Sequence, residues 1–351
     1  MGSPTDTKDE EPVTGFRIRS GPTFTFALAV LALVAAGAPL QAQTVRLGGG
    51  FPPPPGAVDT TVTITVEALK PGVYAAKVSF VWTGWVELGD GILVIDTGFS
   101  EAGARALADT IRARSGPLPI RYVVNTHQHE DHTGGDRYFA TLGATFIAQE
   151  KVAAEIQHLL TWAPGETGDA LSRSDRTPIV KKISRRASYG GTKRPVRVIY
   201  LGRPAHTAGD LVVYLPKQGI LFAGDLVSNR SVPWLLDPDM SVNGWLQSLD
   251  SLLTPAFKIE TLVPGHGDLG KPQASIQFTY HYLLDVREKA STVAAWGTKL
   301  NQIRDWGYLG AYEGMEFYEE VHFMNMRRLY NEAKGIKTPG RKNMHVFKQR
   351  T

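Results

Sequence analysis

The 351-residue sequence contains no cysteine. Disulfide bonds, a thiolate nucleophile and thiolate metal ligands are therefore excluded, so any metal site must be built from histidine and carboxylate. A strong charge of one sign is also lacking, because 38 Lys and Arg oppose 34 Asp and Glu and leave a net charge of +4. This balance gives no indication of a nucleic-acid partner. With 42% hydrophobic and 21% charged residues, the composition is that of an ordinary globular protein.

A long hydrophobic run is missing as well. The most apolar stretch, from Phe24 to Ala38, is too short for a comfortable membrane span and follows Arg17 and Arg19, as in a secretory signal. We expect residues 1–42 to be a signal peptide, with cleavage near Ala42 and a periplasmic or secreted mature protein that has no stable membrane insertion. An uncleaved N-terminal anchor is the alternative.

Composition and periodicity divide the rest of the chain. The run GGGFPPPPG indicates a linker over 43–59. Short β-branched runs separated by turn signals, among them Thr83-Gly84, predict an antiparallel meander at the start of a domain over 60–270. Strands and helices alternate after Asp96, which favours sheets packed together with helices outside. Helical spacing predicts a C-terminal helical extension over 271–336, and a basic tail over 337–351 ends the chain.

A basic stretch interrupts this pattern. Residues 173–197 carry nine Lys or Arg and one acidic residue, Asp175. A solvated insertion loop is the favoured interpretation, because loops tolerate insertions and charge. A lid that attracts an anionic small-molecule substrate is the alternative.

Histidine provides the chemical signal. Four of the nine histidines lie in helical or tail sequence without a second histidine at ligand spacing: His158, His281, His322 and His345. The other five fall at strand ends. In the segment THQHEDH, which follows a predicted strand, His127 and His129 point the same way and can hold one ion, while Asp131 and His132 are turned elsewhere. Three His and one Asp in six residues predict a zinc or iron site.

Three further residues follow strands or occupy glycine-rich turns: His206 in HTAGD, Asp225 in LFAGD and His266 in VPGHG. Together with the HxHxDH segment, their order and spacing resemble the metallo-β-lactamase superfamily over roughly residues 73–267. This resemblance implies an α/β fold, the four-layer αββα sandwich. It also implies a dinuclear zinc site, with one ion on His127, His129 and His206, the other on Asp131, His132 and His266, and Asp225 bridging. Asp96 matches a position that supports a ligand from behind, and a turn-forming Asp is the alternative.

The implied chemistry is metal-dependent hydrolysis. A water held between two zinc ions would lose a proton and attack a carbonyl of a lactam, lactone or thioester, or a phosphoester. Asp131 is the candidate catalytic residue that orients this hydroxide and takes its proton. Seven candidate ligands favour an enzyme, since a structural zinc site closes with four. Iron is the alternative metal, and two other functions stay open: a mononuclear iron persulfide dioxygenase, and a non-enzymatic metal-binding accessory protein of a periplasmic redox or sulfur system.

Within the superfamily, Asp225 stands where Cys-dependent β-lactamases carry their thiolate. Similarity around residues 219–229 is to glyoxalase II-like and exported hydrolases associated with quinoprotein and sulfur-oxidation systems. Asn229 and Trp234 are the candidate substrate contacts, with Ser228, Trp82 and Trp85 as weaker ones. For each tryptophan, packing in the core is the alternative interpretation.

Overall fold

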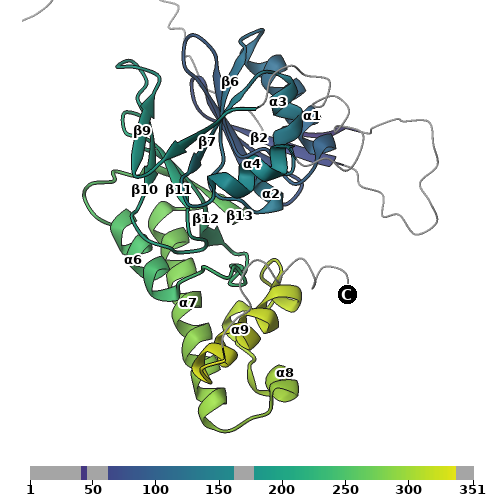
Figure 1. Cartoon of the computed structure of the whole chain (residues 1–351), viewed down its shortest axis with the longest axis vertical. Coiled ribbons are helices and arrows are strands. Elements are labelled where there is room, and N and C mark those ends of the chain that lie inside the picture. The colour runs from purple at the N-terminus through teal and green to yellow at the C-terminus, as the bar shows by residue number, and fades with distance from the viewer. Residues whose placement is uncertain (1–40, 46–61, 162–177, 337–351) are drawn as a thin grey trace, which may run out of the picture. The chain divides into compact units, whose positions relative to one another are not determined.

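The computed structural model describes residues 41–45, 62–161 and 178–336 (Figure 1). Almost all of the expected signal peptide, most of the expected linker and the basic tail lie outside these residues. Among the described helices, none combines the length and the apolar character needed to cross a membrane.

The first half of the fold begins as an antiparallel meander and continues as parallel strands joined by helices. Along β2, buried and more exposed residues alternate, as expected for a strand with one face on a core. The strands are β1 (Gln41–Val45), β2 (Val62–Lys70), β3 (Val73–Val78), β4 (Val81–Glu87), β5 (Ile92–Ile95), β6 (Ile120–Val124), β7 (Thr145–Gln149) and β8 (Val180–Ile183). The helices are α1 (Glu101–Ser115), α2 (Glu130–Thr133), α3 (Asp136–Thr141) and α4 (Ala153–Thr161).

The second half is a sheet in the order β9-β10-β11-β12-β13. Its strands are β9 (Arg186–Tyr189), β10 (Val196–Tyr200), β11 (Leu211–Leu215), β12 (Ile220–Asn229) and β13 (Thr261–Gly267). Helix α6 (Val242–Leu252) connects the parallel strands β12 and β13. The two halves meet where β13 pairs with β4, at the single register position His266 to Val81.

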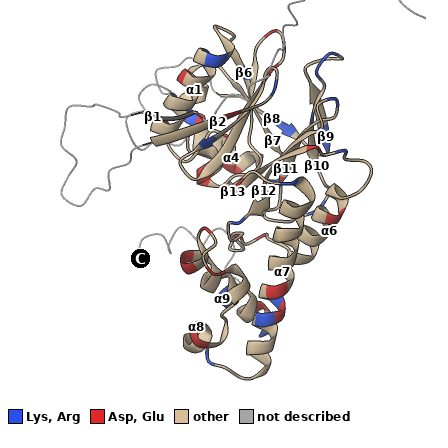
Figure 2. Cartoon of the chain, turned by 180° about the vertical axis from the view of Figure 1, so that it is seen from behind, with Lys and Arg blue, Asp and Glu red and all other residues tan. Residues whose placement is uncertain are grey.

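Two segments of the basic stretch are strands, one in each half of the fold. Residues 180–183 form β8, which pairs with β7, and residues 186–189 form β9, which pairs with β10. The interpretation of this stretch as an insertion loop is therefore wrong for both segments. Figure 2 shows its Lys and Arg on the strands at the ends of the sheet order. Arg194 is a structural residue, since its guanidinium donates to the carbonyl oxygens of Pro71 and Gly72.

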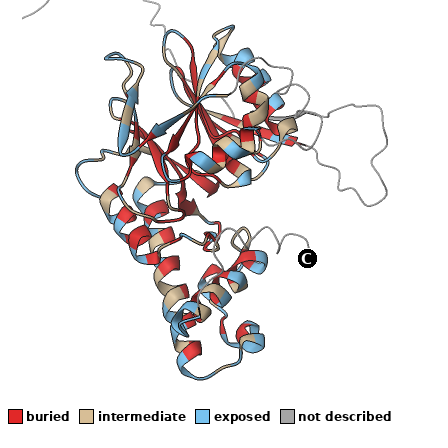
Figure 3. Ribbon diagram, in the orientation of Figure 1, coloured by how far each residue is buried: buried red, intermediate tan, exposed pale blue. Residues whose placement is uncertain are grey.

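Three apolar clusters separate four layers. The middle cluster lies between the sheets and joins Val73 and Leu93 of the first half to Val213 and Phe222 of the second. A second cluster packs α1, α3 and α4 on the first sheet, and a third packs α6 and the C-terminal helices on the other. In Figure 3 the strands are mostly buried, while the outer helices also present exposed residues. This arrangement confirms the αββα sandwich predicted from the sequence.

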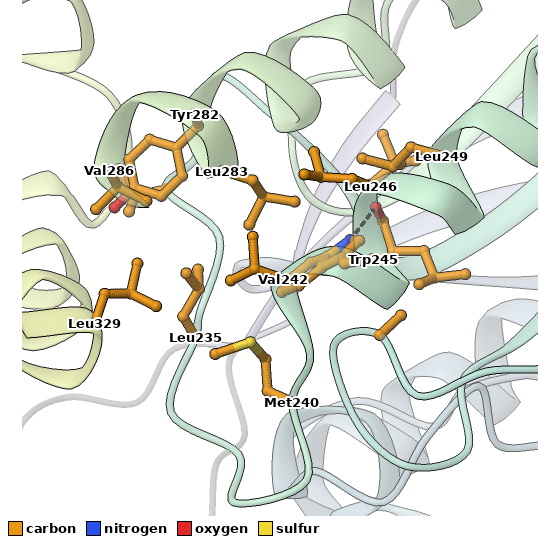
Figure 4. Packing of buried hydrophobic residues seen from close by; sticks show 14 of the residues in the cluster. Leu235, Met240, Val242, Trp245, Leu246, Leu249, Tyr282, Leu283, Val286 and Leu329 are labelled. Atoms are coloured by element: carbon orange, nitrogen blue, oxygen red, sulfur yellow. Dashed lines mark hydrogen bonds between the residues drawn. The ribbon is translucent and has the colours of Figure 1, made fainter. Parts of the chain in front are cut away.

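The C-terminal extension consists of α7 (Pro272–Ala295), η1 (Leu300–Gln302), α8 (Ile303–Trp306), η2 (Gly310–Tyr312), the π-helix η3 (Tyr318–His322) and α9 (Phe323–Ala333). Tyr282, Val286 and Leu329 from these helices belong to the same apolar cluster as Trp245 of α6 (Figure 4). The Trp245 indole nitrogen donates to the carbonyl of Leu226 over 2.9 Å. The extension therefore shares a core with the domain that precedes it.

Two local expectations are wrong. Thr83 and Gly84 do not form a turn, because β4 runs through both residues. Gly84 is needed for packing, since a Cβ there would lie 2.3 Å from the Phe222 ring. The linker predicted from residue 43 fails at its first residues, because β1 (Gln41–Val45) pairs with β2.

Candidate metal centre

The seven candidate ligands come together from five segments of the chain. His127 and His129 follow β6, and Asp131 and His132 lie in the short helix α2. His206 belongs to the loop between β10 and β11. Asp225 and His266 lie on the adjacent parallel strands β12 and β13. The fold therefore places strand ends from both sheets around one location.

The ligand atoms form two groups of four that share Asp225: His127, His129, His206 and Asp225, and Asp131, His132, Asp225 and His266. In the first group, His129 Nδ1 lies 3.1 Å from His127 Nε2 and 2.9 Å from His206 Nε2. Asp225 Oδ2 lies 3.4 Å from His206 Nε2. In the second group, His266 Nε2 lies 3.0 Å from Asp131 Oδ2, and His132 Nε2 lies 3.0 Å from Asp225 Oδ1.

These donors fit a metal ion by chemistry and by distance. Tetrahedral zinc with arms of about 2.0–2.1 Å has neighbouring ligands roughly 3.3–3.4 Å apart, close to the separations above. Among the described residues, His132 Nε2 and Asp225 Oδ1 are buried and lie 3.0 Å apart, yet neither makes a hydrogen bond of acceptable geometry. Imidazole and carboxylate are donors that zinc and iron accept. The side chains present therefore fit two metal ions.

Exposure differs across the site. The side chains of His132 and His206 are 0% exposed, whereas those of His129, Asp131 and His266 are 25%, 22% and 11% exposed. His129, Asp131 and His266 therefore form the solvent-exposed edge of the site. The other side of the site is closed by the protein.

The two groups have opposite electrostatic character. In the first, burial lowers the pKa of His206 to about 4, although Asp225 opposes this shift. Burial together with His132 and His129 also lowers the pKa of His127. Both rings are thus neutral at pH 7 and able to bind a cation.

In the second group, burial alone would lower the pKa of His266, but Asp225 and Asp131 outweigh it and raise this pKa to about 10. Burial alone would raise the pKa of Asp225, but His266 and His132 hold it well below its ordinary value. Before a metal ion binds, this group is consequently a set of ion pairs. Metal binding to such a group releases protons.

Comparison with known proteins places the chain in a family. A sequence model described as the metallo-beta-lactamase superfamily matches residues 76–266, more than half of the chain. The chain belongs to this superfamily.

Named relatives and a solved structure agree. The metallo-beta-lactamase type 2 of Elizabethkingia meningoseptica is 26% identical over 238 residues, which cover 65% of this chain and 88% of the relative. The metallo-beta-lactamase IND-1 of Chryseobacterium indologenes is 25% identical over 198 residues, covering 56% and 76%. The crystal structure of the DIM-1 metallo-beta-lactamase covers 63% of this chain and 97% of its own, with a TM-score of 0.50 and 21% identity, and shows the same fold. The chain is thus a metallo-β-lactamase superfamily hydrolase with His and Asp groups that can bind metal.

Asp96 supports His132 from behind, as the superfamily resemblance predicts. Its Oδ2 lies 2.8 Å from His132 Nδ1, and its Oδ1 accepts a hydrogen bond from the amide of Thr126 over 2.7 Å. The carboxylate therefore fixes the ring so that Nε2 faces the metal position. Asp96 has a φ of 56°, which is uncommon for a residue with a side chain. The structure assigns no turn at Asp96, so its contact with His132 is the role that the geometry supports.

Asp237 fixes the orientation of the His129 ring, as Asp96 fixes that of His132. Asp237 was not identified from the sequence. Its Oδ2 lies 3.2 Å from His129 Nε2 and accepts a hydrogen bond from Gln128 Nε2 over 2.9 Å. Its Oδ1 accepts one from the amide of Asp239 over 2.8 Å. In the sequence, Asp237 precedes Pro238 and reads as a turn residue. Only the tertiary fold brings it to the metal centre.

The structure separates the candidate substrate contacts. The side-chain amide of Asn229 donates to the carbonyl of Asp268 over 2.9 Å, which gives this residue a structural bond. Trp234 is 41% exposed, while Trp82 and Trp85 are buried. Trp85 stacks on Tyr74, and the Trp82 indole donates to the carbonyl of Gly267, next to His266. Core packing is thus the correct interpretation for Trp82 and Trp85, and substrate contact by Asn229 or Trp234 stays a prediction.

Proposed function

We propose that the chain is an exported hydrolase that uses two zinc ions to cleave a small-molecule lactam, lactone, thioester or phosphoester. The observation that carries the proposal is the pair of four-residue donor groups that share Asp225. A structural zinc site needs only one closed set of four ligands. Two donor groups with a partly exposed edge instead suit two neighbouring metal ions that a substrate can reach.

Bound at these positions, two divalent ions would supply an acidified water and polarise the bond under attack. The residues of the chain hold that geometry. Asp225 belongs to both groups and fixes their separation, while Asp96 and Asp237 hold the rings of His132 and His129. Asp131 is 22% exposed and lies 3.0 Å from His266 Nε2. We infer that its carboxylate orients a water and accepts its proton.

The relatives named above make a β-lactam the natural first member of a substrate panel, which then extends to lactones, thioesters and phosphoesters. Each class should be tested as a matched anionic and neutral pair, because an anionic substrate was the alternative interpretation of the basic stretch. We expect turnover of at least one class by the zinc-loaded protein and its loss on chelation. Turnover that survives complete metal removal would contradict the proposal.

Substitutions of candidate ligands test the metal centre, and a substitution elsewhere controls for general effects of mutation. We expect His127→Ala and Asp225→Ala to lower the rate by orders of magnitude while the far-ultraviolet circular dichroism is retained. His281→Ala is the matched control, since this exposed histidine of α7 lies outside both groups. One iron per chain with oxygen consumption on a persulfide would support the dioxygenase instead. Metal binding without turnover across the panel would support the accessory protein.

Export is part of the proposal and rests on the sequence of residues 1–42. Cell fractionation followed by N-terminal sequencing tests it directly. We expect a periplasmic or secreted chain that begins near Gln43. An N-terminus upstream of Phe24 in the membrane fraction would indicate an anchor instead.

A further inference from the structure

Two phenylalanine rings lie beside His266 of the second donor group, and a third ring adjoins one of them. Phe80 lies in the turn between β3 and β4, and its ring stacks on the His266 imidazole with centroids 5.9 Å apart and planes 11° apart. Phe317 meets both rings edge-on, at 5.8 Å from Phe80 and 6.1 Å from His266. Phe99, between β5 and α1, lies 5.7 Å from Phe80 and is 49% exposed. The cluster therefore adjoins the partly exposed edge of the metal centre.

Phe317 comes from the C-terminal extension, outside the region that the superfamily model matches. Its φ of 64° and ψ of 14° are left-handed, which is a rare and strained conformation for a bulky residue. The π-helix Tyr318–His322 follows immediately. Strained residues and π-helical turns both occur often at functional sites.

The neighbouring Glu316 holds this conformation in place. Its amide donates to the carbonyl of Arg230 over 3.0 Å, and its carbonyl accepts from the amide of Val232 over 2.9 Å. Its carboxylate lies 3.9 Å from the Lys77 ammonium of β3. The extension is thus fastened to β3 and to the segment that follows β12, at the point where Phe317 reaches His266.

We propose that Phe80, Phe99 and Phe317 form an apolar wall that selects substrates carrying an aromatic group next to the bond that is hydrolysed. A substrate bound beside His266 would place such a group against the three rings, which retain exposed surface. Aromatic rings pack edge-on or offset on one another and stabilise the contact beyond the burial of area. This inference rests on the proposed function, because it assumes a metal-bound substrate.

The test compares two hydroxamates, which chelate zinc and differ only by a phenyl ring. Isothermal titration of zinc-loaded protein with phenylacetohydroxamate and acetohydroxamate measures the contribution of that ring. We expect phenylacetohydroxamate to bind roughly tenfold to a hundredfold more tightly, the gain expected from burying an aromatic ring. In Phe317→Gly, the affinity ratio should fall several-fold while acetohydroxamate binds as before. Glycine adopts a φ of 64° without strain, so this variant removes the ring and retains the backbone.

Two controls complete the design. Phe317→Leu keeps apolar bulk and should retain part of the preference. Phe278→Ala removes a ring of α7 that contacts Tyr312 and should leave the ratio unchanged. A ratio near one in the unaltered protein, or an unchanged ratio in Phe317→Gly, would overturn the inference. Binding of neither hydroxamate would instead contradict the metal centre itself, and the wall with it.

Discussion

Replacing Asp136 by Asn should change how stability depends on pH. Asp136 of α3 is 1% exposed, and its Oδ1 accepts hydrogen bonds from Thr97 Oγ1 over 2.7 Å and from Asn125 Nδ2 over 3.0 Å. Its Oδ2 is buried without a partner among the described residues. Burial raises the pKa of this carboxyl from 3.8 to about 8, against the two hydrogen bonds that lower it. The acid is therefore neutral at pH 7.

The direction in which stability changes with pH follows from the protons bound by the native and the unfolded chain. Between about pH 4 and about pH 8 the native chain keeps a proton on Asp136 that the unfolded chain has lost, so this group lowers stability as pH rises. The full shift, at about 1.4 kcal/mol per pKa unit, corresponds to roughly 6 kcal/mol as an upper bound. An amide at this position would keep the shape and the acceptor but cannot ionise. The Asp136→Asn variant should gain stability relative to the original chain by up to several kcal/mol across this window, with no further gain above about pH 8.

Urea unfolding at pH steps from about 4.5 to about 8.5, which span the shifted pKa, measures the difference. Both proteins carry the same metal ligands, so the pH dependence of metal binding cancels in the comparison. Asp305→Asn is the control, because water surrounds this exposed side chain in both states. Parallel pH profiles for Asp136→Asn and the original chain would refute the reasoning, as would a variant that loses relative stability as pH rises.

Three further substitutions test the support of the metal centre and of the extension. In Gly265→Ala, the new Cβ would lie 1.9 Å from Asp225 Oδ1, so the shared carboxylate must move. We expect metal affinity, measured by competition with a chelator, to fall at least tenfold. An unchanged affinity would count against the role of Asp225. Asp237→Asn should weaken metal binding roughly tenfold to a hundredfold by freeing the His129 ring. The same metal affinity in this variant and the original protein would show that Asp237 does not support the metal centre. Tyr282→Phe removes a buried hydroxyl that lies 3.1 Å from His322 Nδ1 and accepts a hydrogen bond from Asn325 Nδ2 over 2.9 Å. Urea unfolding should show that the free energy of unfolding falls by about 1–3 kcal/mol while metal affinity is retained. An unaltered unfolding midpoint would contradict this prediction.

The candidate ligands were predictable because their signals are local. Residues 127–132 place three His and one Asp within six residues, and His206, Asp225 and His266 each stand in a short glycine-containing segment. The element order also indicated two sheets with helices outside. Patterns of this kind depend on the period of strand and helix and on the composition of turns.

Other features depended on contacts between distant residues. Asp237 reads as a turn former, and only its approach to His129 reveals a role. Gly84 suggested a turn, whereas it makes room for the Phe222 ring inside a continuous strand. Phe317 carries no signal in its own segment, because its neighbours His266 and Phe80 lie far away in the sequence. Such positions become visible only when the fold has brought the segments together.

The central claim is a centre of two metal ions that share Asp225. The most direct test is the metal content of mature protein purified without added metal, measured by mass spectrometry beside Asp225→Ala prepared in the same way. The account predicts two zinc ions per chain in the original protein and a clear loss in the variant. A single ion per chain, or equal metal content in the two proteins, would contradict it.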